Sequence, residues 1–514
     1  MSKTIIIIGA GLAGLSAALQ AAENGCNVKL VSSLPSERAQ SVMAEGGINA
    51  ALNTKDENDS PEEHFTETIK AVCGLADPNA VWGMTQAAPE LVHWLLKLGV
   101  KFNMSGYDDV DLRNFGGQKK KRTAFAQSDT GKQIMTAMID AVRRKEASGM
   151  VERFSHHSFL TLRLCGNICC GCVIRDEYSQ ETVELPGDAV IVATGGMHGL
   201  FGNTTGSLSN TGEVTAELFR LGVPLANGEM IQYHPTTVKC GGKRMLISEA
   251  ARGEGGRLFA MKDGKQWYFM EEKYPELGNL MPRDITAREI WKVSHESEVF
   301  LDMTEISEEI ISNKLSGLAD DCMTYLHKDI RKEPVSVLPG IHYFMGGILV
   351  DEQHRTSIQN LYAAGECCAQ YHGANRLGGN SLLGALYGGR VAAKSACEQA
   401  DVVDLSCATQ IDFPPASQIS EIKQLNKVMQ ETMGVVRNEN TLLNGIQTVQ
   451  ALTGNLPLLG MAVLKSALAR KESRGAHWRE DYPKSNDDDY LKTTVARFDG
   501  KQIQISFVPV PERR

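Results

Sequence analysis

The order of apolar and polar positions along the chain predicts short strands that alternate with helices. The run at residues 4–8, Thr-Ile-Ile-Ile-Ile, has the length and β-branched composition of a buried strand, and a helical pattern follows from residue 15. Residues 28–31, 189–192 and 361–364 are further, mostly apolar runs, and a glycine follows each of the last two within three positions. Strands that alternate with helices are typical of a parallel sheet covered by helices. We therefore predict an α/β fold.

Later segments show other patterns. Pro61 has the place of a first helical residue, and residues 61–150 alternate helical segments with loops. Residues 225–340 are polar and interrupted, which indicates an inserted domain, after which the chain returns to the first one. Residues 418–475 carry helical periodicity, which predicts a helical region near the end of the chain.

Three glycines follow the first strand at the spacing of a dinucleotide-binding turn. They are Gly9, Gly11 and Gly14. The first permits a tight turn, the second lets the backbone approach a pyrophosphate, and the third lets helix and strand pack closely. The phosphates then lie at the positive end of the helix. Because the motif lies between a strand and a helix, it predicts a bound dinucleotide rather than a structural turn.

The end of the second strand bears on which dinucleotide is bound. A carboxylate at this point usually holds the adenosine ribose, but the chain has Ser32 followed by Ser33. A hydroxyl here is unusual for NAD and compatible with some FAD proteins. The segment therefore favours FAD.

Composition narrows the class of protein. The 514 residues are enough for two to four domains, and their net charge of −9 argues against nucleic-acid binding and against a basic membrane-binding face. No apolar run reaches the length that spans a bilayer. Residues 1–10 run directly into the glycine motif and lack a cleavage site, so we interpret them as a strand rather than a signal peptide. We expect a cytoplasmic protein.

Four of the twelve cysteines lie close together, at positions 165, 169, 170 and 172. One interpretation is a zinc or iron–sulfur site, and the other is a hairpin of two alternating strands around a Gly166–Asn167 turn. Adjacent cysteines at 169 and 170 would point to opposite faces of a strand, and no paired CxxC spacing accompanies them. We therefore predict a hairpin and no metal site.

Residues 38–47 read Arg-Ala-Gln-Ser-Val-Met-Ala-Glu-Gly-Gly. This segment resembles R-S-H-T-x-x-A-E-G-G of the flavoprotein subunits of fumarate reductase and succinate dehydrogenase, a family whose histidine attaches the flavin covalently. Gln40 stands in place of that histidine, and an amide cannot form the bond. The resemblance therefore implies FAD that is bound without a covalent link.

Further motifs of this family recur over essentially the whole chain. Residues 193–196 match the segment that closes the FAD-binding sheet, and residues 210–213 look like its T-G-D motif with Glu213 for the aspartate. Glu366 would hold a ribityl hydroxyl, and residues 372–382 open a helix, with Gly379 where serine is usual. Together the glycine motif and the resemblance imply this set of cofactor-binding residues: Gly9, Gly11, Gly14, Ser32, Gln40, Ser41, Glu45, Gly46, Gly47, Ala193, Thr194, Gly195, Glu213, Glu366, Ser381 and Leu382.

The resemblance also implies the domain organisation. A Rossmann-like FAD-binding domain, residues 1–224 and 341–400, would be interrupted by an α+β capping domain, residues 225–340, and followed by a C-terminal helical domain and tail, residues 401–514. The helical pattern ends in Ala-Arg-Lys-Glu-Ser-Arg-Gly-Ala-His at residues 469–477, as in the family. Its charges suit either a solvated helix with i,i+3 and i,i+4 pairs or a docking surface. We interpret the basic run at residues 119–122 as a solvated loop.

Five basic or imidazole side chains lie in glycine-rich segments in and after the inserted domain. They are His234, Arg252, Arg283, His342 and Arg376. The planar fork of arginine matches a carboxylate, and histidine can donate a hydrogen bond or carry a charge. Each residue alone would more often be structural. Together with a flavin they indicate a site for a small dianion that has a carbon–carbon bond to reduce or oxidise.

The resemblance assigns substrate-binding roles. Arg376, His234 and His342 would hold the two carboxylates, with Ser248 where threonine is usual and Phe115 against the substrate. Twisting one carboxylate out of conjugation would make the double bond electrophilic.

The resemblance also assigns the residues that transfer the proton. A hydride would pass from flavin N5 to one carbon, while Arg283 delivers a proton to the other and Glu249 and Arg252 relay that proton from solvent. Because the ordinary pKa of arginine is above about 12, this acid requires a strongly basic carbanion and immediate reprotonation. The alternative is that Arg283 is an electrostatic clamp.

Two further observations bear on the direction of the reaction and on the source of its electrons. In the family the histidyl link raises the flavin potential, and about 100 mV alters a two-electron driving force by roughly 4.6 kcal/mol. Gln40 therefore favours the reduction of fumarate to succinate. The sequence contains neither a second dinucleotide motif nor iron–sulfur spacing, so the resemblance implies an iron–sulfur partner subunit, or another external electron donor. Such a partner could hold the protein at the periphery of a membrane.

Three other functions stay open. L-aspartate oxidase shares the fold but has a glutamate in place of Phe115 to meet the substrate ammonium. A reductase of another 2-enoate is compatible with Ser248 and Gly379, which could reshape the pocket. A non-catalytic flavin carrier would not require the intact set of arginines and Glu249.

Overall fold

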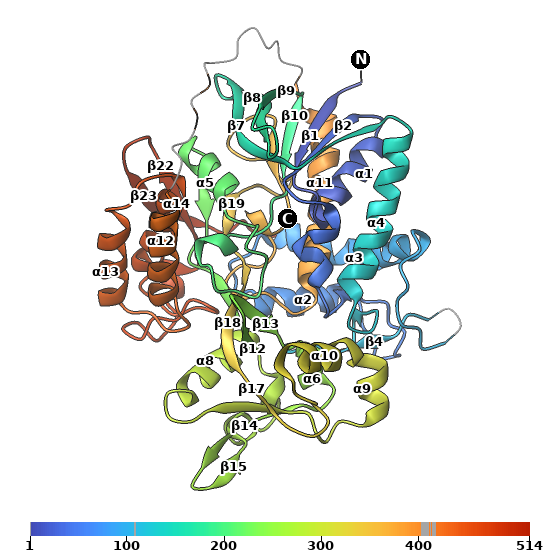
Figure 1. The fold of residues 1–514 in the computed structure, drawn as a ribbon, viewed down its shortest axis with the longest axis vertical. Coiled ribbons are helices and arrows are strands. Elements are labelled where there is room, and N and C mark those ends of the chain that lie inside the picture. Colours follow the sequence, from blue (N-terminus) through green and yellow to red (C-terminus); the bar gives the residue numbers. More distant parts are fainter. Residues whose placement is uncertain (1, 107–108, 402–410, 412, 414–417) are drawn as a thin grey trace.

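The computed structural model describes residues 2–106, 109–401, 411, 413 and 418–514. Its central layer is a parallel sheet with the strand order β20-β10-β1-β2-β6 (Figure 1). The strands are β1 (Thr4–Ile8), β2 (Asn27–Ser32), β6 (Val151–Ser155), β10 (Ala189–Val192) and β20 (Leu361–Ala363). β1, β10 and β20 are buried almost throughout, as expected of a parallel sheet covered on both faces. The four predicted apolar strands are confirmed.

Helices cover one face of this sheet and a second sheet covers the other. The helices are α1 (Leu12–Glu23), α4 (Thr130–Ala147) and α11 (Asn380–Gln399), which share a core with Ile5, Ile7 and Leu30. The covering sheet is β7 (His157–Cys165), β8 (Ile168–Asp176) and β9 (Thr182–Pro186), packed against Ile6, Ile8 and Val190. Strands β7 and β8 form the predicted hairpin around residues 166–167.

Two further helices precede α4 in the chain, and the second of them adds Met84, Leu91 and Leu95 to the same core. They are α2 (Pro61–Ala71) and α3 (Pro78–Lys97). The helix start predicted at Pro61 is confirmed, because the Ser60 hydroxyl accepts a hydrogen bond from the Glu63 amide at 3.2 Å and caps the helix.

The inserted region lies below the first one in Figure 1 and has its own apolar core. One sheet has the order β13-β12-β18, and the other has the order β15-β14-β16-β17. Their strands are β12 (Ile231–Cys240), β13 (Lys243–Leu246), β14 (Arg257–Lys262), β15 (Lys265–Trp267), β16 (Val299–Asp302), β17 (Val335–Ser336) and β18 (Leu338–Phe344). The helices are α6 (Glu249–Gly253), α7 (Phe269–Lys273), α8 (Arg283–Val293), α9 (Glu308–Lys314) and α10 (Ser316–Asp321). Pairing of β12 with β18 joins the beginning and the end of the insertion.

The C-terminal region contains the predicted helices, which lie at the left in Figure 1. They are α12 (Ile419–Thr432), α13 (Glu439–Val449) and α14 (Asn455–Ala469). A hairpin follows that the sequence analysis did not predict, β22 (Lys492–Phe498) and β23 (Ile503–Pro509). It extends a sheet whose other strands are β11 (Leu225–Ala226), β19 (Gly347–Leu349) and β21 (Cys368–Ala369). Among the described helices, none has both the length and the apolar character to cross a bilayer.

The charged motif at residues 469–477 differs from the solvated helix that we considered. Helix α14 ends at Ala469, and the side chains of Arg470 and Glu472 are fully buried. Arg470 Nη1 donates to Glu472 Oε1 at 2.8 Å, and Arg470 Nε donates to Glu229 Oε1 at 2.7 Å. The prediction of charge pairs along a solvated helix is therefore wrong. These side chains instead form a buried hydrogen-bonded network that connects the C-terminal region to the inserted region.

The basic run at residues 119–122 is only partly a solvated loop. Lys119 and Lys121 are exposed, but the Arg122 side chain is fully buried. Its guanidinium pairs with Asp59 at 2.9 Å and with Glu67 at 3.0 Å. The interpretation is therefore wrong for Arg122, because two carboxylates from distant segments compensate for its burial.

Candidate active site

The carboxyl ends of the parallel strands open on a cavity of about 870 Å³ that also reaches the inserted region. All the predicted site residues line this cavity except Gly14 and Arg252. Those on the side of the sheet are Gly9, Gly11, Ser32, Gln40, Ser41, Glu45, Gly46, Gly47, Ala193, Thr194, Gly195, Glu213, Glu366, Ser381 and Leu382. Those at the other end are Phe115, His234, Ser248, Glu249, Arg283, His342 and Arg376.

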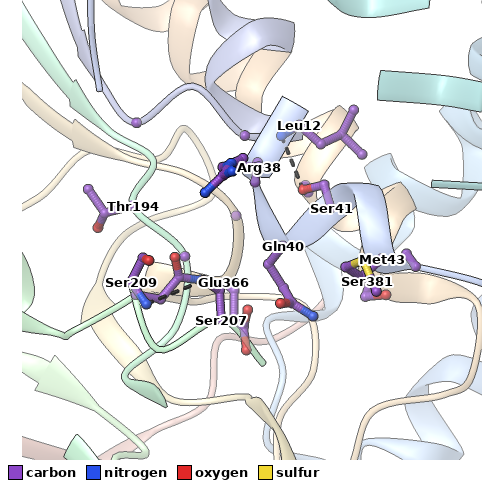
Figure 2. A pocket seen from close by; sticks show the side chains of 18 of the residues that line it. Leu12, Arg38, Gln40, Ser41, Met43, Thr194, Ser207, Ser209, Glu366 and Ser381 are labelled. Carbon is purple, nitrogen blue, oxygen red and sulfur yellow. Dashed lines mark hydrogen bonds between the residues drawn. The ribbon is translucent and has the colours of Figure 1, made fainter. Parts of the chain in front are cut away.

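The start of α1 forms one wall of the cavity. Gly9 has a φ of +111°, and a Cβ there would lie 2.2 Å from the Ala193 carbonyl oxygen. A Cβ at Gly14 would lie 1.8 Å from the Gly9 carbonyl oxygen, so this glycine serves packing rather than the cavity. No side chain caps the helix at its N-cap, Gly11, although the Leu12 amide donates to Ser41 Oγ at 3.2 Å (Figure 2). A helix N-terminus with free amides favours a phosphate.

The start of α11 reaches the cavity from another side. Its N-cap, Gly379, has a φ of +83° and no side chain caps the helix. A Cβ at Gly379 would lie 2.1 Å from Asn49 Oδ1, so the serine usual in the family would not fit here unless Asn49 moved. Ser381 and Leu382, in the first turn, line the cavity. This second positive helix end also favours negative charge on whatever is bound.

Polar side chains on the wall suit a dinucleotide. Ser32 Oγ is buried and has no hydrogen-bond partner among the described residues, so it is available for a ribose hydroxyl. Figure 2 shows Arg38, Gln40, Thr194 and Glu366 around the cavity. The unpartnered hydroxyl and the two uncapped helix ends therefore fit FAD.

Two histidines lie side by side at the other end, because they come from the paired strands β12 and β18. The ring centroids of His234 and His342 are 5.1 Å apart. His342 Nδ1 lies 2.8 Å from Thr205 Oγ1. Burial, and then the charge of Arg283, lowers the pKa of both imidazoles well below the ordinary value. Both rings are therefore neutral near pH 7.

The tautomer of His234 determines what it offers the cavity. His234 Nδ1 lies 3.1 Å from the Thr236 carbonyl oxygen, to which it could donate, and 3.3 Å from the Thr236 amide, from which it could accept, while Nε2 is buried without a partner among the described residues. In the tautomer that accepts this amide bond, Nε2–H is a donor aimed at a bound carboxylate.

Three charged residues form a continuous hydrogen-bonded chain. Arg283, the first residue of α8, donates to Glu249 Oε2 from Nε at 2.9 Å and from Nη2 at 2.6 Å. Arg252 Nη2 donates to the other oxygen, Glu249 Oε1, at 3.1 Å. Burial raises the pKa of Glu249, but the two guanidinium groups more than offset it and the net shift is downward. Glu249 is thus an ionised bridge between the cavity and Arg252 behind it.

Arg376 presents an incompletely paired cation. Its guanidinium carbon lies 4.4 Å from the centre of the Tyr343 ring, and its Nε is buried without a hydrogen-bond partner among the described residues. Burial, and then the nearby Arg283, lowers the pKa of Arg376 to about 9. Because a buried cation is costly unless it is paired, the position favours an anionic ligand.

Some lining or linking residues were missed by the sequence analysis. Gln232 accepts from Arg283 Nη1 at 3.0 Å and donates to the Arg376 carbonyl oxygen at 2.8 Å, so it links the two arginines. The signal was present, because Gln232 lies two positions before His234 in an alternating strand. Thr205 lies in a loop without a pattern, and no sequence signal could have placed it at His342.

Comparisons with known proteins extend over the whole chain. Residues 4–382 match the family of FAD binding domains, and residues 452–513 match the fumarate reductase flavoprotein C-terminal family. The succinate dehydrogenase flavoprotein subunit of Bacillus subtilis is 38% identical over 576 aligned residues, with 100% of this chain and 98% of the relative covered. The 8-methylmenaquinol:fumarate reductase flavoprotein subunit of Wolinella succinogenes is 32% identical, with 100% and 92% covered.

A solved structure agrees with these relatives. A variant of the E. coli quinol fumarate reductase protein FrdA superposes with a TM-score of 0.90 at 27% identity, with 99% of this chain and 97% of that chain covered. The match to the FAD-binding family takes in more than half of the chain, and the relatives span its full length. This chain therefore belongs to the family of FAD-dependent succinate dehydrogenase and fumarate reductase flavoproteins.

Proposed function

We propose that this protein reduces fumarate to succinate as the flavoprotein subunit of a fumarate reductase. The observation that carries the proposal is the hydrogen-bonded chain Arg283–Glu249–Arg252, which ends at the same cavity as Arg376, whose Nε has no hydrogen-bond partner among the described residues. A proton path and a dianion site thus meet at one place.

The substrate carboxylates would be held by groups of complementary charge. Arg376 supplies a guanidinium for one carboxylate, and the neutral His234 and His342 supply N–H donors without adding further charge. Ser248, the N-cap of α6, adds a hydroxyl. Phe115 lies at the cavity where an ammonium-binding carboxylate would be needed for an amino acid, which disfavours L-aspartate as substrate.

The proton would come from Arg283. Its three donor nitrogens are directed at Glu249 and Gln232, which fixes the plane of the guanidinium. After Arg283 gives up a proton, the neighbouring Glu249 and Arg252 are placed to return one from the far side. FAD, when bound against the two helix ends, would supply or accept the hydride.

The direction of the reaction is a further part of the proposal. Gln40 lines the cavity and cannot form the histidyl link that raises the flavin potential in the resembling proteins. We therefore expect the FAD-loaded, photoreduced protein to be reoxidised by fumarate at least about tenfold faster than the oxidised protein is reduced by succinate. Stopped-flow absorbance of the flavin under anaerobic conditions measures both rates.

Crotonate and iminoaspartate are the matched comparisons for that experiment. Reoxidation of the flavin by one of these compounds and not by fumarate would show that fumarate is not the substrate. No response to any of them would overturn the enzyme assignment and favour a flavin carrier. Equal rates of flavin reoxidation by fumarate and flavin reduction by succinate would contradict only the proposed direction of the reaction.

The flavin is expected to be held without a covalent bond. Precipitation of the purified protein with trichloroacetic acid should leave essentially all of the yellow colour in the supernatant, because the Gln40 amide is not a nucleophile toward the flavin. Absorbance of the pellet and the supernatant measures the partition. Flavin that stays in the washed pellet would contradict this prediction.

An external protein is proposed to supply electrons. The Wolinella relative is named as a subunit of an enzyme that uses 8-methylmenaquinol, so other subunits are expected there. We propose that an iron–sulfur subunit serves this chain. Affinity purification from native extract should recover such a partner with iron and acid-labile sulfide in proportion to flavin, and recovery of the chain alone would count against it.

A further inference from the structure

The loop at residues 204–206 lies beside the part of β18 that carries His342. The Thr205 amide donates to the Ile341 carbonyl oxygen at 3.0 Å, and the Arg244 amide of β13 donates to the Thr204 carbonyl oxygen at 3.0 Å. Thr204 also forms a parallel bridge with Ile341. Main-chain hydrogen bonds to two strands therefore fix the place of Thr205.

Packing from behind holds the same loop. The Thr204 hydroxyl lies 3.0 Å from His198 Nδ1 and accepts a hydrogen bond from the Gly206 amide at 3.2 Å. A Cβ at Gly206 would lie 2.2 Å from the His198 ring, so the absence of a side chain there lets ring and loop pack this closely. The His198 ring in turn contacts the Phe344 ring edge-on, with the centroids 5.0 Å apart. None of these contacts uses the Thr205 side chain, so removal of its hydroxyl should leave the loop in place.

The Thr205 hydroxyl has two acceptors within reach and one hydrogen to donate. Its Oγ1 lies 2.8 Å from His342 Nδ1 and 3.4 Å from the Ile341 carbonyl oxygen. The shorter distance is typical of a hydrogen bond from a hydroxyl, whereas the longer one indicates a weak interaction. The Ile341 carbonyl oxygen also accepts the Thr205 amide already. His342 Nδ1 is therefore the better acceptor for the hydroxyl.

A hydroxyl that donates to Nδ1 determines which nitrogen of the His342 ring carries hydrogen. The ring is neutral near pH 7, since burial, and then the charge of Arg283, lowers its pKa. A neutral imidazole has one ring hydrogen, and its other nitrogen is an acceptor. When Nδ1 accepts from Thr205, the hydrogen is on Nε2, which can donate to a carboxylate. In the opposite arrangement Nδ1 would donate to Thr205, and Nε2 would present a lone pair that repels a carboxylate.

We propose that Thr205 is a positioning residue for the dicarboxylate: its hydroxyl donates to His342 Nδ1 and keeps the ring in the tautomer whose Nε2–H binds a substrate carboxylate. Both residues line the cavity. This inference rests on the proposed function, in that a dicarboxylate binds at this site. His342 would contact the substrate, and Thr205 would act through it.

The test uses malonate, a dicarboxylate that has no double bond to reduce, with the FAD-loaded protein. Thr205→Val keeps the shape of the side chain but removes the hydroxyl. Isothermal titration calorimetry at pH 7 should show about tenfold weaker malonate binding by this variant, the order of one hydrogen bond to a charged group. Thr205→Ser keeps the hydroxyl and should bind within about threefold of the wild type. Thr161→Val is the matched control, because its buried hydroxyl donates to Glu217 at 2.6 Å and does not line the cavity.

The position of the ring hydrogen is a second readout, which a mere loss of stability would not move. Long-range nitrogen–proton correlation spectra of the imidazoles, assigned with His342→Gln, distinguish hydrogen on Nε2 from hydrogen on Nδ1. We expect it on Nε2 in the wild type and in Thr205→Ser, and on both nitrogens in malonate-free Thr205→Val. A wild-type ring with its hydrogen on Nδ1, or a Thr205→Val protein that binds malonate as tightly as the wild type, would overturn the inference. A wild type that binds no malonate, although its ring hydrogen is on Nε2, would instead overturn the proposed dicarboxylate site itself.

Discussion

Replacing Arg283 with alanine is expected to slow fumarate reduction by about a thousandfold while malonate still binds. General acid–base catalysis typically contributes 10²–10⁴ in rate, and Arg283 is placed as the acid at the cavity. Substrate carboxylates would be held mainly by Arg376 and the two histidines, so Kd should change by less than about tenfold. Stopped-flow reoxidation of the photoreduced flavin and malonate calorimetry measure the two quantities.

Lysine at position 283 distinguishes a proton donor from an electrostatic clamp. Lysine keeps the charge but not the fork that reaches Glu249 and Gln232 together. We expect Arg283→Lys to be nearly as slow as Arg283→Ala, and activity above about a tenth of the wild type would favour the clamp. Arg288→Ala is the matched control, because Arg288 is on the same helix but stacks on Trp478 at 4.0 Å and does not line the cavity.

Replacing Arg470 with alanine is expected to lower the free energy of unfolding by about 3–5 kcal/mol, the usual cost of breaking a buried ion pair. The Arg470 guanidinium pairs with Glu229 and Glu472, and both carboxylates are fully buried. It also donates to the Tyr490 and Lys492 carbonyl oxygens at 2.8 and 2.7 Å. Its loss would leave the buried Glu229 carboxylate without its ion-pair partner, while Glu472 would keep its hydrogen bonds from Arg474.

Amide hydrogen exchange of α14 and residues 470–482 measures this effect. Since 1.4 kcal/mol is a factor of ten, exchange that requires opening of this region should be faster by at least about a hundredfold. Lys471→Ala is the matched control, because the neighbouring side chain is exposed. If Arg470→Ala exchanged like the control and only partner binding were lost, a docking role would replace the structural one.

The part of the site that lies on the side of the sheet was predictable from the sequence, because it depends on short-range interactions along the chain. The turn at Gly9, the helix from Leu12 and the strand that ends at Ser32 all follow from short-range constraints on φ, packing and apolar pattern. The strand at residues 189–192 and the helix after Gly379 could be predicted in the same way.

The chemistry at the other end depended on long-range contacts. His234 and His342 are more than a hundred positions apart in the chain, and the pairing of β12 with β18 brings their rings together. Resemblance to a family supplied their roles, but the bond from Gln232 to Arg283 and the contact of Thr205 with His342 required the fold.

Burial of charged side chains could not be predicted from the local sequence. Runs such as residues 119–122 and 469–477 have the composition of solvated segments, yet Arg122 and Arg470 are fully buried. A charged side chain can be buried only where partners from elsewhere compensate for lost hydration, and those partners, Asp59 and Glu229, are distant in sequence.

By itself, then, the sequence determined the parallel sheet, the glycine turn at its edge, the helical C-terminal region and the FAD-binding family. These features depend on local periodicity, on turn geometry and on motifs that are contiguous in the chain. The tertiary structure decided which charges are buried, how Glu249 bridges two arginines, and which distant segments line one cavity. Each of these depends on the distance between groups from separate segments, because electrostatic energy and hydration vary with separation and burial rather than with position along the chain.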